Sequence, residues 1–480
     1  MPAASGAETA GRTARVDTAR LAAVCAVGVA IWLAPEPAGV EPRAWQLLAI
    51  FVATMVGIVL RPLPMGAVAL IAVAVAVLSG TLTIAEATAG FGNTVVWLVV
   101  AAFFIATAFV KTGLGTRIAY HFMRVLGRRS LGLAYGLVAA DLVLAPAIPS
   151  NTARAGGVIY PILRSLCVSL DSAAEDGTER RIAAFLTFTV YQGVVVTSAM
   201  FLTAMAANPL VVELAAQQGV EISWALWAAA AAVPGVLSLL LVPLLIYRLY
   251  PPQITHTPAA PEFARQRLGE LGAMTRHERI LLAVFVLLLS LWIGGGALGV
   301  SATTTALAGV AAMLANGLLA GVDILRARSG WDTLIWFAVL VMLASQLGEL
   351  GLLAWFTDRV SGVLVVGHWL PAFLSLSLIY FYVHYFFASN TAHVSAMYAP
   401  FLALALAVGT PAVLAALLLG FFSNLYASLT HYGTAAAPIL FGSGNVAIGT
   451  WWKLGLVISV VNIIIWVGAG SLWWRLLGLW

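Results

Sequence analysis

Charged residues are scarce in this chain. Only 9% of its 480 residues are Asp, Glu, Lys or Arg, whereas 62% are hydrophobic. Soluble globular proteins contain about 25% charged residues, so this composition excludes a soluble protein and indicates a polytopic membrane protein. Cysteine is also rare. The two present, Cys25 and Cys167, lie in apolar segments far apart in the sequence and predict free thiols without a disulfide framework.

Clusters of catalytic or metal-binding residues are missing as well. No group of His, Asp and Glu has the spacing of metal ligands or of a nucleophile and its base, which argues against a membrane enzyme and predicts no metal and no cofactor. No segment repeats a polar helix face, so an anion channel is not indicated. The net charge of +5 arises from basic residues in short loops, so it indicates membrane topology and no nucleic-acid partner.

Long apolar runs predict an all-α protein with eleven membrane crossings. A helix needs about 20 apolar residues to span ~30 Å of hydrocarbon. The predicted crossings are residues 21–34 with their flanks, 44–60, 65–78, 94–110, 182–216, 224–247, 280–298, 303–321, 334–350, 412–441 and 451–476.

Two further apolar stretches, residues 131–167 and 370–408, are interrupted by polar residues near their middle. Each interruption leaves arms too short to span the membrane and return. We expect two re-entrant hairpins, because unpaired backbone at membrane depth is tolerated only where it is buried in protein or lines a polar cavity. Both hairpin tips should therefore face a polar site.

The basic residues orient the chain. With the N-terminus in the cytoplasm, 20 of the 24 Lys and Arg fall in cytoplasmic segments. Five crossings in each half then give inverted repeats, an architecture of alternating-access transporters. The preference for Arg over Lys and the abundance of Ala suggest a GC-rich bacterial genome, and hence a bacterial cytoplasmic membrane. The predicted parts are a cytoplasmic tail (1–20), a first helix (21–44), repeats 45–247 and 279–480, and a cytoplasmic linker (248–278).

One pattern of residue types occurs at both predicted tips. Ser-Asn-Thr is followed by a basic residue in each, and the first serines are 389 − 150 = 239 residues apart. These side chains can cap a helix N-terminus, whose partial positive charge favours a carboxylate. A single copy is equally compatible with capping alone, whereas two matched copies favour a site for two carboxylates. The candidate substrate contacts are Ser150, Asn151, Thr152, Ser389, Asn390 and Thr391.

Arg154 and His393 each follow the first serine of a tip by four residues. A cation at bilayer depth is costly and by default functional. We interpret both as tethered charges that replace mobile coupling ions, which would penalise return of an empty carrier and favour exchange. Another interpretation stays open: Arg154 snorkels to the cytoplasmic face and His393 is a neutral core residue. Asp141 either pairs with Arg154 or caps a turn.

Two crossings are predicted to be broken. The crossing at 182–216 contains Ser198, Asn208 and Pro209, and the one at 412–441 contains Gly, Thr and Pro at comparable places. Such interruptions in both halves of a transporter point to its binding site. Ser198 is therefore a further candidate substrate contact.

The paired Ser-Asn-Thr tips, the sequence Phe441-Gly-Ser-Gly444 and the inverted eleven-helix plan resemble the divalent anion sodium symporter family of dicarboxylate and citrate carriers. Pro149 to Arg154 and His384 to His393 are most similar to its bacterial 2-oxoglutarate/malate, citrate and tartrate translocator branch, whose members are described as exchangers. The resemblance covers nearly the whole chain after residue 20. It implies a homodimer, a transport domain that moves as an elevator against a scaffold, and substrate contacts at both tips and at Thr434.

The broken crossings depart from the sodium symporter pattern, because Met205-Ala-Ala207 and Thr434-Ala-Ala436 stand where that pattern has Thr-Pro-Pro. This departure argues against sodium coordination and agrees with tethered cations. We therefore expect a secondary active transporter that exchanges C4/C5 dicarboxylates such as malate, 2-oxoglutarate or succinate. Sodium-coupled symport of dicarboxylate or citrate is the alternative. The expected partners are small dicarboxylate anions, the lipid bilayer and a second copy of the chain.

Overall fold

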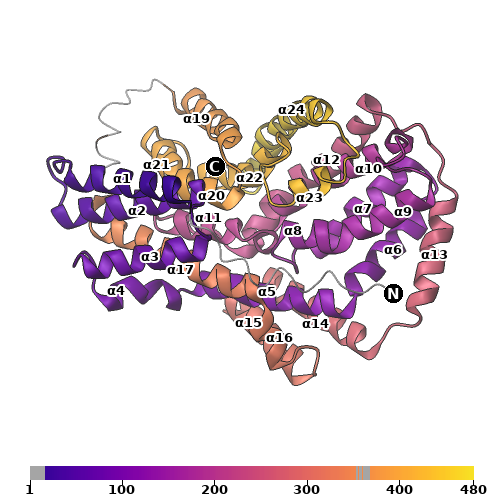
Figure 1. Ribbon diagram of the computed structural model, residues 1–480, viewed down its shortest axis with the longest axis horizontal. Helices are drawn as coiled ribbons and strands as arrows, with labels where there is room; N and C mark the ends of the chain where they lie inside the picture. Colours follow the sequence, from indigo (N-terminus) through magenta and orange to yellow (C-terminus); the bar gives the residue numbers. More distant parts are fainter. Residues whose placement is uncertain (1–16, 353–354, 356–358, 360–367) are drawn as a thin grey trace. The chain divides into compact units, whose positions relative to one another are not determined.

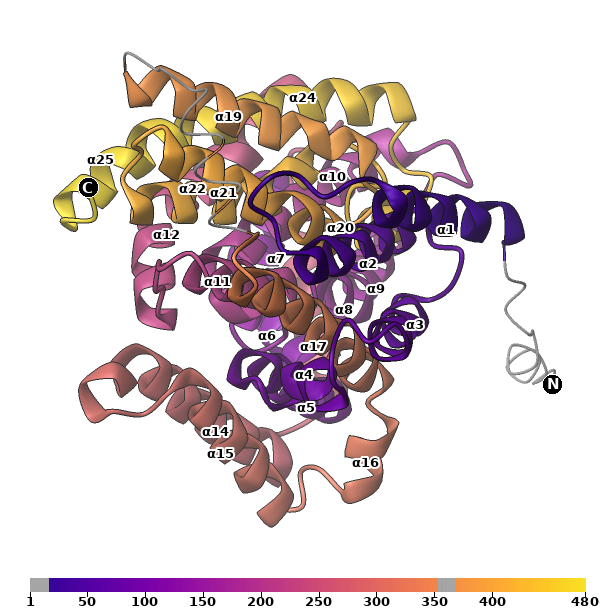
Figure 2. The same cartoon turned by 90° about the vertical axis from the view of Figure 1, so that its left-hand side faces the viewer.

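The computed structural model describes residues 17–352, 355, 359 and 368–480, so most of the predicted tail lies outside the described residues. These residues form helices and loops (Figures 1 and 2). An isolated β-bridge joins Arg129 and His256 within the described part of the chain. The protein is an all-helical membrane protein. Among the described residues, eight helices are long and apolar enough to cross a membrane: Pro42–Leu60, Thr94–Thr112, Ala183–Met200, Trp224–Leu249, Arg276–Leu298, Arg328–Glu349, Trp369–Phe386 and Ile448–Leu476.

These eight helices are not simply a subset of the eleven predicted crossings. Trp369–Phe386 has the length of a span although it falls in the stretch assigned to the second hairpin. Several predicted crossings are shorter helices, among them Thr18–Leu33 and Met65–Leu78. Length alone does not decide which helices cross, so the number eleven stays a prediction.

The described chain divides into two compact units, one of residues up to 92 with 335–356, the other of residues 93–334 with those from 357 on. In the smaller unit α1 packs on α2, and α2 packs on α3. Arg43 forms an ion pair with Glu86 at 2.8 Å, and the backbone N–H of Thr83 together with Arg43 lowers the pKa of Glu86 to about 2. The helices of the smaller unit are α1 (Thr18–Leu33), α2 (Pro42–Leu60), α3 (Met65–Leu78), α4 (Ile84–Thr88) and part of α17 (Arg328–Glu349).

The larger unit is built around α10. All 18 residues of α10 are buried, and it packs against α7, α12 and α22. Figure 1 shows α7, α9 and α10 side by side. The first part of this unit comprises α5 (Thr94–Thr112), α6 (Leu114–Leu126), α7 (Ser130–Leu144), α8 (Asn151–Arg154), α9 (Tyr160–Ser169), α10 (Ala183–Met200), α11 (Ala207–Ala216) and α12 (Trp224–Leu249).

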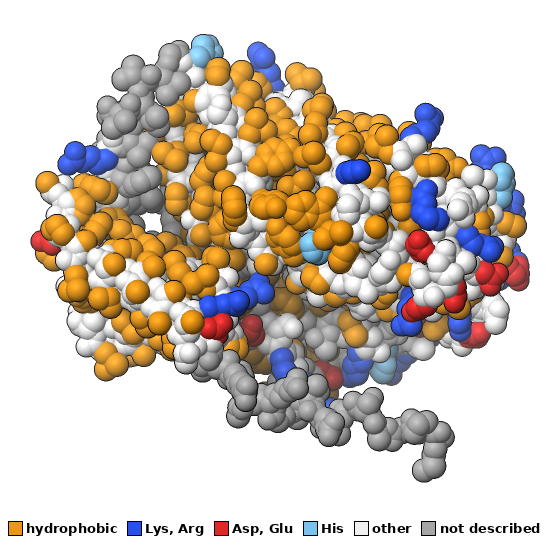
Figure 3. Space-filling model, turned by 45° about the horizontal axis from the view of Figure 1, so that its top comes forward, with side chains coloured by type: hydrophobic (Ala, Val, Ile, Leu, Met, Phe, Trp, Pro, Cys, Tyr) orange, Lys and Arg blue, Asp and Glu red, His pale blue; other side chains and the backbone are white. Residues whose placement is uncertain are grey.

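The linker between the two halves folds back on α6 through helix α13 (Ala259–Leu271). The buried guanidinium of Arg117 on α6 forms an ion pair with Glu278 at 2.6 Å and donates to the carbonyl of Gly272 at 2.9 Å. Figure 3 shows charged side chains gathered at the right-hand end, where α13 lies in Figure 1, whereas hydrophobic side chains cover much of the visible face. The linker is therefore a folded polar cap on the larger unit.

The second part of the larger unit contains α19, α21 and α22, which pack against one another (Figure 2). Its helices are α14 (Arg276–Gly294), α15 (Ala302–Ala315), α16 (Gly321–Arg326), α19 (Trp369–Val383), α20 (Asn390–His393), α21 (Ala399–Ala407), α22 (Ala412–Leu425), α23 (Ala437–Phe441), α24 (Ile448–Ile464) and α25 (Ser471–Leu476).

Candidate substrate site at the two tips

In both Ser-Asn-Thr sequences the serine has an extended backbone and the helix begins at the asparagine that follows it. The side-chain oxygen of Ser150 accepts a hydrogen bond from the N–H of Ala153 at 3.1 Å, and that of Ser389 accepts one from Ala392 at 3.4 Å. Both serines are therefore N-caps, as their residue type favours. A capping serine still has its hydroxyl hydrogen, and the first N–H groups of the helix have no partner within it. Capping and substrate binding are thus compatible at one residue.

The helix that follows each tip widens at the same place. A π-helical segment, Ala155–Ile159, separates α8 from α9, and another, Val394–Tyr398, separates α20 from α21. Proline follows each segment, at Pro161 and Pro400, and proline has no N–H to continue the regular helical bonding. π-helical turns occur frequently at functional sites. The two tips therefore share a local structure that reaches beyond the repeated sequence.

Arg154 is fully buried beneath the first tip and uses every guanidinium nitrogen. Its Nε forms an ion pair with Asp141 at 3.0 Å. Its Nη1 donates to the carbonyls of Ile148 at 2.8 Å and Ala204 at 2.5 Å, and its Nη2 donates to the hydroxyl of Ser198 at 2.8 Å. Arg154 therefore does not snorkel to the surface.

Asp141 compensates the charge of Arg154. Its side chain is 1% exposed, and its second carboxylate oxygen accepts a hydrogen bond from Thr197. The ion pair carries no net charge, so Asp141 neutralises the tethered charge of Arg154 within the site, and the guanidinium acts there as a set of fixed hydrogen-bond donors. Of the two alternatives for Asp141, pairing is the one observed.

Ser198 belongs to this network. Its hydroxyl donates to the carbonyl of Val194 at 2.7 Å and accepts from Arg154, and the residue is 1% exposed. With its hydrogen and an acceptor position in use, Ser198 holds the guanidinium in place. Its predicted contact with substrate finds no support in this arrangement.

His393 is buried beneath the second tip and is hydrogen-bonded to His384. Their Nδ1 atoms are 3.0 Å apart, and Nε2 of His384 lies 2.8 Å from the carbonyl of Gly433. A carbonyl only accepts, so Nε2 of His384 carries a hydrogen. With both rings neutral, His393 then donates from Nδ1 to Nδ1 of His384. Nε2 of His393 is left as a buried acceptor without a partner among the described residues.

The two networks are related by the repeat. The broken helices start at Ala183 and Ala412, an offset of 229, which pairs Ala204 of the first break with Gly433 of the second (204 + 229 = 433). Both carbonyls accept from the basic residues of the nearby tip: Arg154 directly, and His393 through His384. In the first half one guanidinium links the tip to the carbonyl at the helix break, and in the second half two hydrogen-bonded imidazoles make this link.

The structure joins the first tip to the second broken helix. The amide of Asn151 donates to the hydroxyl of Thr434 at 2.8 Å, and the amide of Asn390 donates to the carbonyl of Ser423 at 3.1 Å. Asn151, Asn390 and Thr434 are buried, whereas Ser150, Thr152, Ser389 and Thr391 are partly exposed. The four partly exposed hydroxyls are the groups best placed to meet a ligand.

Sequence reasoning did not predict the contacts that three further residues make with this network. Thr197 donates to Asp141, and the ring of Tyr426 stacks on His393 with centroids 4.5 Å apart and planes 3° apart. Tyr380, which stands 239 residues after Asp141, also contacts the His393 ring at 4.6 Å. The repeat spacing could have indicated Tyr380, because it places this residue beside His393 at the position that Asp141 has beside Arg154.

Replacing Gly433 with alanine is expected to disturb the His384 hydrogen bond. A Cβ at this position would lie 2.8 Å from Nε2 of His384 and 2.8 Å from the hydroxyl of Thr430. Overpacking of this kind costs about 1–3 kcal/mol, so we expect a lower melting temperature and at least about tenfold slower transport. Gly449→Ala is the matched control, because nothing lies within 4 Å of its Cβ. Equal transport by both variants would contradict a role for His384.

Comparison with known proteins places the chain in a family. A family model described as the sodium:sulfate symporter transmembrane region matches residues 15–480. The chain belongs to this family. The match confirms the resemblance to divalent anion sodium symporters that the tips indicated. Its relatives are transporters and not enzymes, and so is this protein.

Several relatives match over almost the whole chain. The putative malate transporter YflS of Bacillus subtilis is 52% identical over 98% of this chain and 99% of its own length. Dicarboxylate transporter 1, chloroplastic, of Spinacia oleracea is 49% identical over 94% of this chain and 80% of its own. Inner membrane protein YbhI of Escherichia coli is 40% identical over 95% and 97%.

Two solved structures share the fold at low sequence identity. The Neisseria gonorrhoeae pump MtrF superposes with a TM-score of 0.60 at 13% identity, covering 94% of this chain and 97% of that chain. The Alcanivorax borkumensis YdaH transporter gives 0.54 at 15% identity, covering 96% and 97%. These likenesses confirm the fold, that of an all-helical polytopic membrane protein, and carry no information about the substrate.

Proposed function

We propose that this protein is a secondary active transporter that exchanges C4/C5 dicarboxylates, such as malate, 2-oxoglutarate or succinate, across a bacterial cytoplasmic membrane, with its N-terminus inside. The names of its relatives, a putative malate transporter and chloroplast dicarboxylate transporters, support the substrate class. The two tips supply matching chemistry, because each offers free helix N–H groups and hydroxyls to one carboxylate.

One observation carries the proposal of exchange. The carbonyls of Ala204 and Gly433, at equivalent positions of the two helix breaks, are already hydrogen-bonded to side chains of the protein. Backbone carbonyls at such breaks are the groups that coordinate sodium in other transporters. Arg154 and the pair of His393 with His384 occupy these oxygens and cannot dissociate. In this proposal they stand in for the coupling cations.

Exchange also follows from the state of an empty site. Without substrate, the first N–H groups of each tip helix and the hydroxyl hydrogens of the two capping serines have no partner among the described residues. Carrying such unpaired polar groups through a hydrocarbon layer is costly. A bound dicarboxylate satisfies them. The loaded carrier therefore crosses readily, whereas the empty one does not.

The proposal includes an elevator movement of a transport domain within a homodimer, as the family resemblance implies. All the candidate site residues lie in the larger of the two units. A site contained within one unit can move as a whole, which supports this mechanism.

The test is uptake of labelled malate or 2-oxoglutarate into liposomes that contain the purified protein. We expect uptake to require internal dicarboxylate and to proceed equally in sodium and choline buffers, because no mobile cation completes the site. Liposomes without protein give the background. Uptake into liposomes without internal dicarboxylate, driven by a sodium gradient, would contradict exchange and establish sodium-coupled symport.

A further inference from the structure

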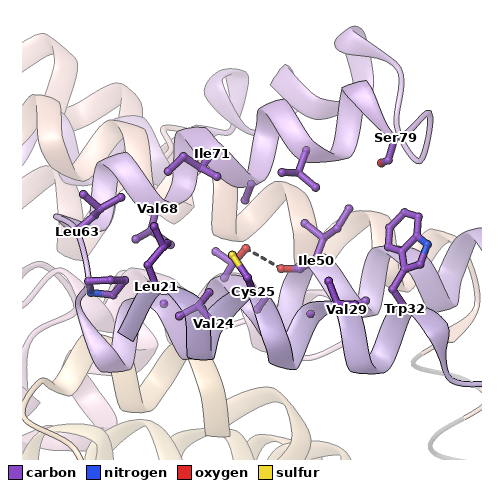
Figure 4. A pocket seen from close by; sticks show the side chains of 18 residues that line it. Leu21, Val24, Cys25, Val29, Trp32, Ile50, Leu63, Val68, Ile71 and Ser79 are labelled. Carbon is purple, nitrogen blue, oxygen red and sulfur yellow. Dashed lines mark hydrogen bonds between the residues drawn. The ribbon is translucent and has the colours of Figure 1, made fainter. Parts of the chain in front are cut away.

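Helices α1, α2 and α3 of the smaller unit enclose an apolar groove with a volume of about 470 Å³. Figure 4 shows Leu21, Val24, Cys25 and Val29 of α1 on one wall, and Val68 and Ile71 of α3 on the other. The polar side-chain atoms in the lining are few, and the hydroxyl of Thr54 is satisfied by the carbonyl of Ile50 at 2.7 Å. Apart from Trp32 and Ser79, which lie toward the far end, the lining is almost entirely apolar, so the groove suits a hydrocarbon.

The groove runs along α1 from Leu21 to Trp32. Leu63 lies at the Leu21 end and Ser79 at the Trp32 end (Figure 4). Eleven residues of helix rise about 17 Å. This is close to the hydrocarbon thickness of one leaflet, half of ~30 Å. One acyl chain that extends from the headgroup level toward the bilayer centre fits this length.

Two arginines stand at the Leu21 end. Arg20 precedes the groove on α1, where it pairs with Asp17 at 3.1 Å and donates to the carbonyl of Leu60 at 3.1 Å. Arg61 precedes Pro62 of the groove and is exposed. It makes no ion pair among the residues that the structure describes. Two guanidiniums against one carboxylate give this end a net positive charge.

The backbone holds Arg61 in an unusual conformation. Its φ is 52°, in the left-handed region that residues with a Cβ seldom adopt. Its N–H closes α2 on the carbonyl of Gly57 at 2.9 Å. Glycine or asparagine would fit this C-terminal position with less strain. The turn itself therefore gives no reason for an arginine at this position.

We propose that this groove is a binding site for one anionic phospholipid, with an acyl chain between α1, α2 and α3 and the phosphate at Arg20 and Arg61. Basic residues at the membrane surface each favour an anionic lipid by about fivefold. The enclosing walls give one lipid more protein contact than a flat helix surface does. This site is separate from the transport function and does not depend on it.

Native mass spectrometry of the purified full-length protein, incubated with equal amounts of phosphatidylglycerol and phosphatidylcholine, tests the site. We expect one phosphatidylglycerol to be retained in preference. Arg61→Gln should lower this preference about fivefold, whereas Arg276→Gln, which removes an exposed arginine of the other unit, should leave it unchanged. Gln at position 61 keeps the same backbone strain, so the comparison isolates the charge.

A second pair of variants tests the groove itself. Ile71→Trp fills it and should abolish the retained lipid, whereas Leu70→Trp, at a neighbouring residue of similar exposure outside the groove, should not. Thermal unfolding separates a filled groove from a misfolded protein, and Arg61→Gln remains informative if Ile71→Trp does not fold. Equal retention of both lipids, or retention by Ile71→Trp, would overturn the proposal. So would a disulfide between Cys25 residues of two copies in membranes, because a second chain would then cover the groove.

Discussion

Replacement of Arg154 by alanine is expected to abolish dicarboxylate exchange and to destabilise the fold by about 3–5 kcal/mol, the cost of leaving one partner of a buried ion pair alone. The side chain of Asp141 is 1% exposed and would keep only its hydrogen bond from Thr197. The carbonyls of Ile148 and Ala204 would lose the same donor. Thermal unfolding of the purified variant and counterflow in liposomes measure the two effects.

The same variant should respond to sodium. Without the guanidinium, a carboxylate, two carbonyls and the hydroxyl of Ser198 converge on the space it filled, and oxygen ligands of this kind suit a hard cation. We expect the melting temperature of Arg154→Ala to be higher in sodium chloride than in choline chloride, and that of the unmodified protein to be equal in both.

Asp141→Asn combined with Arg154→Ala is the control for this prediction. It removes the unpaired carboxylate, so it should recover part of the stability and lose the sodium response, while exchange stays absent. If Arg154→Ala exchanged dicarboxylate at the normal rate, Arg154 would be structural only, and the proposed stand-in role would be lost.

The parts of the site that occur in both repeats could be predicted from the sequence. Ser-Asn-Thr followed by a basic residue is visible in both halves, and the capping preference of these residue types predicted the helix starts that the structure has at both tips. The broken crossings were also accessible, because Pro209 in the first half and Gly433 and Pro438 in the second interrupt the apolar runs a few turns beyond the ends of α10 and α22. Residue type determines these features directly, through capping and through backbone conformation.

The side chain of Asp141 was predictable as a partner of Arg154, but the backbone groups that accept from the basic networks were not. Ala204 and Gly433 take part through backbone carbonyls, and a carbonyl is the same in every residue. Only the position of the helix break decides that these oxygens are free to accept. The pairing of His384 with His393 likewise depends on the 3₁₀ turn His384–Phe386 and the extended residue Phe387, which bring two histidines nine positions apart together.

His393→Phe is expected to slow exchange at least about tenfold, a loss of about 1.4 kcal/mol or more. Phenylalanine preserves the stacking of this ring between Phe387 and Tyr426, whose centroids lie 4.7 and 4.5 Å away. It cannot donate to His384, so the buried Nδ1 of His384 loses its partner at a cost of about 1–3 kcal/mol. The expected result is therefore a protein that folds with reduced stability and transports poorly.

His384→Phe should give the same loss of exchange, because it leaves the Gly433 carbonyl without a donor and His393 without its partner. Since the two histidines act through one chain of hydrogen bonds, the double variant should be little worse than either single variant. His121→Phe, at an exposed position on α6, is the matched control and should exchange normally. Additive losses in the double variant would show that the histidines act separately, and the second tip would then have no counterpart of the Arg154 network.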